Sequence, residues 1–167
     1  MIPEQRLLSR FRGGRVLLDT NLLLLLLIGA FERERIEKFK RTAGFTKFDY
    51  DQLVGFLRLF SKIVTTPHIL TEVSNLAGAL PDNVRESWST HFARKAATFF
   101  EVFEESRLLM SGISFGAFGL TDAAIHSLAA NTLILTEDFR LSGFLRSAKL
   151  PVFNFRELIQ LSKVQMS

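Results

Sequence analysis

The sequence R-V-L-L-D-T-N-L-L-L-L-L-L-I, residues 15–28, decides the fold. Its first apolar run, residues 16–18, lies between a glycine pair and the turn-forming residues 19–21, which is the pattern of a buried parallel strand. The leucine-rich run that follows predicts a helix buried on most of its faces. Ligands bind beyond the carboxyl ends of the strands in open parallel sheets, so Asp19 is predicted to face a site and not the core.

A secretory signal peptide is the main alternative for this stretch, because residues 22–30 are apolar or small and follow several arginines. It fits poorly, since Asp19 and Asn21 adjoin the apolar run and charged residues follow it directly at 32–35. The run is also too short for a membrane span, which takes about 20 apolar residues. We therefore predict a strand, a turn and a helix, with no membrane segment.

Length and composition point to a single domain. A chain of 167 residues can bury about 70% of the surface that its unfolded form would expose. The absence of cysteine excludes disulfides and thiolate metal sites and favours a cytoplasmic location. The net charge of +4 is, by itself, weak support for a nucleic-acid partner.

Strand-like and helix-like patterns alternate along the rest of the chain. Further strands are predicted at 63–64, 132–135 and 151–155, with a strand stub at 108–110. Thr66 and Thr121 are predicted helix caps, a glycine-rich turn is predicted at 111–119, and helices are predicted at 31–40, 50–60, 66–80, 84–105, 121–129, 139–145 and 156–164. This alternation predicts an α/β fold, a three-layer α/β/α sandwich with a mainly parallel central sheet.

Four acidic residues are placed where predicted strands end or helices begin: Asp19, Glu72, Asp122 and Asp138. In a parallel sheet these positions meet at one edge, so the four carboxylates are predicted to converge. Each also has an ordinary structural role open to it, as a helix cap, a turn former or an ion-pair partner. The joint arrangement is what favours a functional site.

Carboxylates held within a few ångströms of one another repel unless a cation neutralises them. With no cysteine and no histidine cluster nearby, oxygen ligands favour Mg²⁺ or Mn²⁺ over zinc. Setting the four acids aside leaves 21 basic against 13 acidic residues, a charge of +8, which suits a substrate that carries phosphates. The basic residues near the predicted edge in sequence are Arg12, Arg15, Arg140 and Arg146.

Four short motifs, in this order, resemble those of the PIN-domain ribonucleases, which include the VapC-like toxins of toxin–antitoxin pairs. They are V-L-L-D-T-N at 16–21, T-P-H-I-L-T-E-V at 66–73, G-L-T-D-A-A-I at 119–125 and L-I-L-T-E-D-F at 133–139. The resemblance covers nearly the whole chain and implies a single PIN-like domain over 1–167. Relative to a minimal member of the family, this chain has a helical insertion around 31–62 and a long helix around 84–105.

The resemblance implies a metal-dependent endoribonuclease. Its metal-binding and catalytic residues would be Asp19, Glu72, Asp122 and Asp138, supported by Asn21 and Thr136. One or two Mg²⁺ or Mn²⁺ ions would lower the pKa of a bound water, place it in line with an RNA phosphodiester and stabilise the leaving oxygen. The family also implies a homodimer and, for a toxin, a cognate antitoxin that blocks it.

Several alternatives stay open. Glu137 could replace Asp138 as the fourth acid, although the T-x-D spacing favours Asp138. His126 follows Asp122 by one helical turn and is expected to lie behind the ligands or in the core. Two other functions compete: a catalytically silent RNA-binding or interaction module of the same fold, and a haloacid-dehalogenase-like phosphatase. The phosphatase would use Asp19 as a nucleophile and leaves the other predicted ligands poorly explained.

Overall fold

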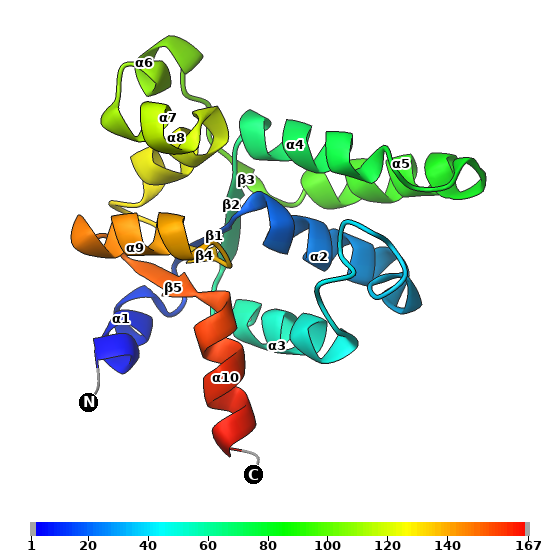
Figure 1. The fold of residues 1–167 in the computed structure, drawn as a ribbon, viewed down its shortest axis with the longest axis horizontal. Helices are drawn as coiled ribbons and strands as arrows, with labels where there is room; N and C mark the ends of the chain where they lie inside the picture. The colour runs from blue at the N-terminus through cyan, green and yellow to red at the C-terminus, as the bar shows by residue number, and fades with distance from the viewer. Residues whose placement is uncertain (1–2, 166–167) are drawn as a thin grey trace.

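The computed structural model describes residues 3–165 of the chain. At its centre lies a five-stranded sheet, parallel throughout, in the order β3-β2-β1-β4-β5 (Figure 1). The strands are β1 (Arg15–Leu18), β2 (Lys62–Thr65), β3 (Phe100–Glu101), β4 (Leu133–Thr136) and β5 (Val152–Asn154). The predicted α/β class with a parallel central sheet is confirmed.

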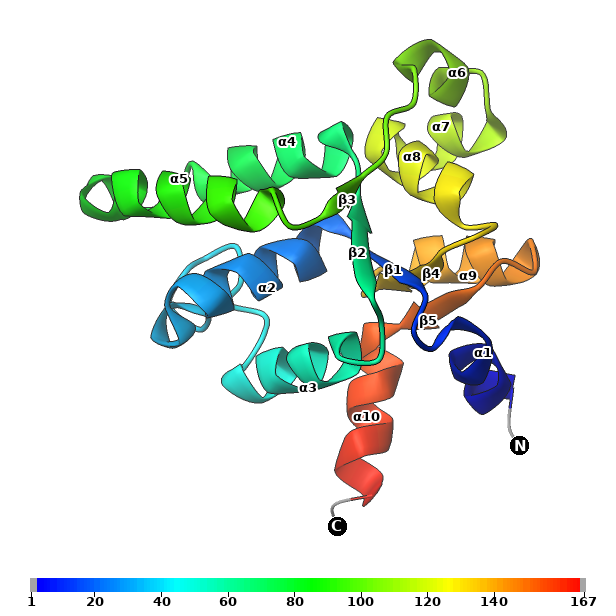
Figure 2. The ribbon, with the colours of Figure 1, turned by 180° about the vertical axis from the view of Figure 1, so that it is seen from behind.

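Helices cover both faces of this sheet. In the described residues they are α1 (Pro3–Phe11), α2 (Thr20–Phe31), α3 (Lys47–Leu57), α4 (Pro67–Ala77), α5 (Asp82–Ala96), α6 (Ser106–Met110), α7 (Ile113–Phe118), α8 (Leu120–Leu128), α9 (Phe139–Ser147) and α10 (Phe155–Gln165), with a 3₁₀ turn, η1 (Arg33–Arg35). Helices α2 to α5 lie on one side of the sheet, and α8 and α9 lie on the other (Figures 1 and 2). None of the helices within residues 3–165 combines the length and the apolar character that a membrane crossing needs.

Strand β1 is central because it pairs with both β2 and β4. Leu17 lies opposite Val64 on one side and opposite Ile134 on the other, and all three side chains are buried. After β3 the chain crosses to the other side of β1 to form β4, so the strand order reverses between β1 and β4. At such a switch point the carboxyl ends of the strands leave a crevice for ligands.

The leucine run forms α2, and it is apolar on nearly all sides because other helices enclose it. Besides the sheet, α2 contacts α3, α4 and α5 (Figure 2). Gly29 is needed where Tyr50 of α3 crosses this helix, since a Cβ at that position would lie 2.3 Å from the tyrosine ring. The predicted buried helix is confirmed.

The predicted helix over 84–105 is wrong in its second half. Helix α5 ends at Ala96, and Phe100 begins β3, where it lies opposite Val64 of β2. Strand β3 is a two-residue edge strand with both residues exposed, and the neighbouring Phe99 and Phe103 continue the helical spacing of the residues before it. Pairing with β2 forms this strand, and local propensity does not reveal it.

Two predictions around residue 110 are also wrong. Residues 108–110 belong to helix α6 and are not a strand, and most of the predicted turn at 111–119 forms helix α7. Both helices are short and contact α8, so their stability comes from packing that the local pattern does not show. Helix α8 begins at Leu120 with Gly119 as its N-cap, so the predicted cap at Thr121 is wrong.

The predicted helical segment at 31–40 is replaced by turns. A single 3₁₀ turn follows α2, and Ile36 and Phe39 are buried in the core. The Thr42 hydroxyl donates to the carbonyl of Ile36 at 2.8 Å and to that of Phe39 at 3.3 Å. A side-chain hydroxyl thus satisfies backbone groups that a helix would have paired. The other predicted helices and strands are confirmed, with ends shifted by a few residues.

Candidate functional site

Asp19 directly follows β1 and is the N-cap of α2. Its Oδ1 accepts a hydrogen bond from Leu22 N at 2.9 Å, and its Oδ2 accepts from Thr136 Oγ1 at 2.5 Å and from Glu137 N at 2.9 Å. The residue is only 7% exposed. Burial raises the pKa of Asp19 to about 6, although the three hydrogen bonds act in the opposite direction. Asp19 is therefore a buried carboxyl group held in place by three donors.

Thr136, the last residue of β4, links Asp19 to Asp138. Besides donating to Asp19, its hydroxyl accepts a hydrogen bond from Asp138 N at 3.0 Å. Asp138 is the N-cap of α9, and its Oδ1 accepts from Arg140 N at 2.7 Å and from Leu141 N at 3.1 Å. The carboxyl ends of β1 and β4 thus place two of the four predicted acids on either side of one threonine.

Glu72, in α4, is held by two threonines that adjoin other predicted acids. Thr20 Oγ1 donates to Glu72 Oε2 at 2.8 Å, and Thr121 Oγ1 donates to Glu72 Oε1 at 2.6 Å. Thr20 follows Asp19 and Thr121 precedes Asp122 in the sequence. This pair of hydroxyls therefore ties α4 to the starts of α2 and α8. The sequence patterns did not reveal a role for Thr20 and assigned Thr121 to a helix cap.

Asp122 lies in the first turn of α8, whose N-cap, Gly119, has a φ of 89°. Burial is the main cause that raises the pKa of Asp122 to about 7, and the negative charges of Asp19, Asp138 and Glu72 add to it. The positive charge of Arg140 acts in the opposite direction. All three of the other acids that the sequence singled out therefore act on Asp122, in addition to its burial.

The four acids form one cluster at the switch point between β1 and β4. Hydrogen bonds through three threonines connect their elements, and the negative charges of the other three acids contribute to the raised pKa of Asp122. Within residues 3–165, no three acidic or histidine side chains are placed so that they could hold one metal ion between them. The carboxylates of Asp19, Glu72 and Asp138 are instead turned toward hydroxyl and backbone donors.

Glu137, the alternative fourth acid, is engaged with other partners. Its Oε1 accepts from Asn21 Nδ2 at 3.1 Å, and its Oε2 pairs with Arg156 at 2.8 Å. The Arg156 guanidinium also donates to Gly44 O at 3.2 Å and lies over the Phe45 ring at 4.4 Å. This network fixes the end of β4 against the loop before α3. The side chain of Asn21, predicted to support the site, donates its hydrogen bond to Glu137.

We expect Arg156→Ala to lower the free energy of unfolding by about 1–3 kcal/mol. The substitution leaves the partly buried Glu137 carboxylate without its cationic partner. Urea unfolding at neutral pH measures the loss. The double variant Arg156→Ala/Glu137→Gln should be more stable than Arg156→Ala alone, because it leaves no unpaired charge. Strictly additive losses would contradict the pairing.

Of the four arginines near the predicted edge, Arg140 is the one at the acid cluster. Arg12 precedes β1 and Arg15 begins it, so both lie at the amino end of the strands, opposite the acids. Arg146 lies in the last turn of α9 and pairs with Glu157 of α10, with one N–O distance of 3.0 Å. Arg140 is close enough to Asp122 to affect its pKa.

His126 is engaged with the helices behind the acids. Its Nδ1 lies 3.2 Å from Ser114 Oγ, and its ring packs against Phe144 with the ring centres 5.1 Å apart. These contacts join α8 to α7 and α9. The imidazole therefore has a packing role in the described structure.

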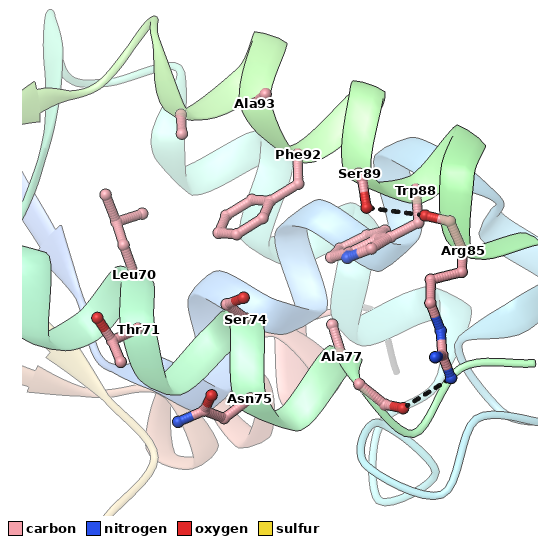
Figure 3. Close-up of a pocket in the computed structure, with 12 residues that line it drawn as sticks. Leu70, Thr71, Ser74, Asn75, Ala77, Arg85, Trp88, Ser89, Phe92 and Ala93 are labelled. Carbon is pink, nitrogen blue, oxygen red and sulfur yellow. Dashed lines mark hydrogen bonds between the residues drawn. The ribbon is translucent and has the colours of Figure 1, made fainter. Parts of the chain in front are cut away.

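A groove of about 630 Å³ lies between α4 and α5 (Figure 3). Leu70, Trp88 and Phe92 form its apolar walls, and Arg85 reaches across one end toward Gly78 O at 3.5 Å. Among the described residues that line it, none is Asp, Glu or His. The groove therefore lacks groups for acid–base or metal chemistry, which the acid cluster has.

No protein-family model, curated protein or solved structure matches this chain.

Proposed function

We propose that this protein is a PIN-like, metal-dependent endoribonuclease that hydrolyses RNA phosphodiesters with Mg²⁺ or Mn²⁺. The observation that carries the proposal is the cluster of Asp19, Glu72, Asp122 and Asp138 at the switch point of the sheet. Acidic groups whose charges raise the pKa of a neighbour destabilise a fold, and such groups concentrate at functional sites. The sequence resemblance to PIN-domain nucleases supports the same four residues.

The donor set fits a hard divalent cation. Four carboxyl groups offer only oxygen ligands, which Mg²⁺ and Mn²⁺ prefer. Glu72 and Asp138 are exposed and Asp122 is partly exposed, so these three side chains have room to turn toward an ion. A bound cation would neutralise the shared negative charge, lower the pKa of a water and stabilise the leaving oxygen of a phosphodiester.

The protein's own groups divide the remaining tasks. Asp19, fixed by three donors, would anchor the site, while Thr20 and Thr121 orient Glu72. Arg140 would place a positive charge on the phosphate next to the acids. The basic remainder of the chain would draw a polyanion toward this edge.

The two competing functions fit the geometry less well. A phosphatase nucleophile needs a carboxylate oxygen open to phosphorus, whereas both oxygens of Asp19 accept hydrogen bonds and the residue is buried. A phosphoenzyme trapped on Asp19 would support the phosphatase. A silent RNA-binding module has no need of an acid cluster, and a protein that binds RNA but no metal would support that function.

The proposal extends to partners and location. Resemblance to VapC-like nucleases supports a homodimer in the cytoplasm and, if the protein is a toxin, a cognate antitoxin. Light scattering of the purified protein tests the dimer. Relief of growth inhibition by a co-expressed neighbouring gene product tests the antitoxin.

Cleavage of an end-labelled single-stranded RNA by the purified protein tests the proposed function. We expect cutting with Mg²⁺ or Mn²⁺ and none with EDTA. A DNA strand of the same sequence, run beside it, separates ribonuclease from general nuclease activity. No cutting, together with no heat of metal binding in calorimetry, would contradict the proposal.

We expect the double variant Thr20→Val/Thr121→Val to bind Mn²⁺ about 10- to 100-fold more weakly than the wild type, as when groups that orient metal ligands are lost. Valine keeps the shape of each side chain but removes the hydroxyl that donates to Glu72. Calorimetric titration measures the affinity. Thr71→Val, at the exposed position before Glu72, is the matched control and should bind as the wild type does. Equal affinity in all three proteins would show that the orientation of Glu72 does not matter.

A further inference from the structure

Phe139, the first residue of α9, is largely exposed beside the acid cluster. It directly follows Asp138 and has 61% of its surface exposed, whereas Leu141 and Leu145 of the same helix are buried in the core. In the described part of the chain its ring makes no aromatic or cation contact. A single exposed aromatic is ordinary on a protein surface. Phe139, however, directly follows a candidate catalytic acid, so its exposed ring is available to a ligand bound at the acid cluster.

The backbone that carries Phe139 is held firmly. Asp138 Oδ1 accepts hydrogen bonds from the backbone N–H groups of Arg140 and Leu141, which follow Phe139, and Thr136 Oγ1 accepts from Asp138 N. The turn before α9 is therefore fixed on both sides of the phenylalanine. The ring is presented at a defined place at the sheet edge and does not depend on a mobile loop.

Arg140 adds a positive charge at the same place. Its guanidinium lies over the Phe118 ring, 5.4 Å from the ring centre, and one of its nitrogens is 3.4 Å from Ala117 O. It forms no ion pair with any acidic group in the described residues, although its charge acts on Asp122. Arg140 is thus a cation held in place and available to an external anion.

We propose that Phe139 stacks on an unpaired base of the substrate and that Arg140 contacts the adjoining phosphate, so that these two residues position the strand at the acid cluster. The inference rests on the proposed ribonuclease function and names two residues that would hold its substrate. Aromatic rings that accept bases and cations that accept phosphates are the two elements that single-strand-binding sites combine. Here both lie within two residues of Asp138, as the first and second residues of α9.

A duplex cannot use Phe139 and Arg140, which together we call the stacking platform, in the same way. The faces of paired bases are covered by their neighbours in the stack, and an exposed phenyl ring can reach a base face only where the strand is open. A duplex would offer Arg140 its phosphates but would offer Phe139 nothing. Removing the ring should therefore weaken the binding of a single strand but not the binding of a duplex.

The first experiment measures RNA binding without cleavage, in Asp19→Asn protein. We expect Phe139→Ala to weaken binding of a short single-stranded RNA by roughly 5- to 150-fold, the range for losing one stacked base. It should leave binding of a hairpin duplex unchanged, and Phe139→Tyr should restore the single-strand affinity. Arg140→Gln should reduce the salt dependence of binding by about one phosphate contact. The matched control is Phe100→Ala, because Phe100 also lies beside an arginine, Arg15, but belongs to the edge strand β3, which β2 separates from β1.

A spectroscopic readout tests stacking directly. Trp88 is the one tryptophan of the chain and is 4% exposed, so Phe139→Trp adds a solvent-exposed reporter beside a buried one. We expect its fluorescence to be quenched by single-stranded RNA and not by the duplex. An RNA with an abasic residue at the contacted position should quench less.

The possible outcomes separate this inference from the proposed function. Weaker single-strand binding in Phe139→Ala supports the platform, whether or not the wild type cuts RNA. Absence of cleavage by the wild type would contradict only the nuclease proposal. Unchanged binding in Phe139→Ala, equal losses for single strand and duplex, or no RNA binding at all would overturn the platform. A changed oligomeric state with unchanged RNA binding would assign Phe139 to a protein interface instead.

Discussion

Asp19→Asn is expected to lower metal-dependent RNA cleavage by at least about 10³-fold, which corresponds to several kcal/mol of lost charge stabilisation. Asp19 is the one acid of the cluster that is both buried and fixed by three donors. Asparagine retains one acceptor oxygen for Leu22 N, but it removes the negative charge and presents an NH₂ group to the Glu137 N–H. The measurement is single-turnover cleavage of labelled RNA with saturating Mn²⁺.

Asp49→Asn is the matched control. Asp49 is also a buried aspartate, 5% exposed, and its carboxylate likewise accepts a backbone hydrogen bond, from Thr46 N at 2.8 Å. It belongs to the capping box of α3 and not to the acid cluster. We expect Asp49→Asn to lose stability but to cut RNA at the wild-type rate. Equal rates for Asp19→Asn and wild type, with circular dichroism showing both folded, would remove Asp19 from the catalytic centre.

Much of the fold could be predicted because buried parallel strands and capped helices leave strong local patterns. The runs at 16–18 and 133–135 are wholly apolar since both faces of the sheet are covered. The Thr66-Pro67 pair starts α4 as predicted, with Thr66 Oγ1 accepting from Ile69 N at 3.3 Å. The alternation of these strands and helices predicts a parallel sheet, but it does not predict the order of the strands within that sheet.

The parts of the fold that were missed depend on tertiary contacts. Strand β3 forms through its backbone pairing with β2, and helices α6 and α7 are too short to be stable without their tertiary contacts. The segment after α2 carries apolar residues at helical spacing, yet Ile36 and Phe39 reach the core from turns that Thr42 stabilises. A local pattern cannot distinguish these cases from an ordinary helix.

The acids of the site could be predicted as a set, but their supporting groups could not. Asp19, Asp122 and Asp138 are next to a strand end or a helix start, Glu72 lies further along α4, and parallel topology brings the strand ends and helix starts together. Thr20 and Thr121 contact Glu72 across 52 and 49 residues of sequence, and each also occupies a position typical of a helix start. Their role as donors to a carboxylate appears only when the three helices are in place.

The metal-free protein is expected to lose stability between about pH 5 and about pH 8. Asp122 has a pKa of about 7 in the folded protein, raised by burial and by the other acids, and Asp19 has a pKa of about 6. A carboxyl group whose folded pKa exceeds its unfolded pKa binds its proton more tightly when folded. Its stabilising contribution is complete below the unfolded pKa, 3.8, and is lost as the pH rises through the folded value.

The free energy of unfolding of the metal-free protein should fall by about 2–4 kcal/mol between these two pH values, since one pKa unit corresponds to about 1.4 kcal/mol. For a domain of this size the melting temperature should fall by roughly 4–16 °C. Thermal unfolding in EDTA at the two pH values measures it. Mg²⁺ should recover much of the loss at the higher pH, because a cation that binds the folded state neutralises the same charges.

The variant Asp122→Asn separates the contribution of Asp122 to this pH dependence from the contributions of other titrating groups. Burial lowers the pKa of His91, which makes stability rise with pH, but this contribution is present in both proteins and cancels in their comparison. We expect the variant to lose less stability than the wild type as the pH rises and to gain less from Mg²⁺, because its cluster holds one charge fewer. Parallel pH curves for the two proteins would mean that Asp122 titrates like an isolated surface carboxylate. The four acids would then be too far apart to share an ion, and the nuclease proposal would lose its structural basis.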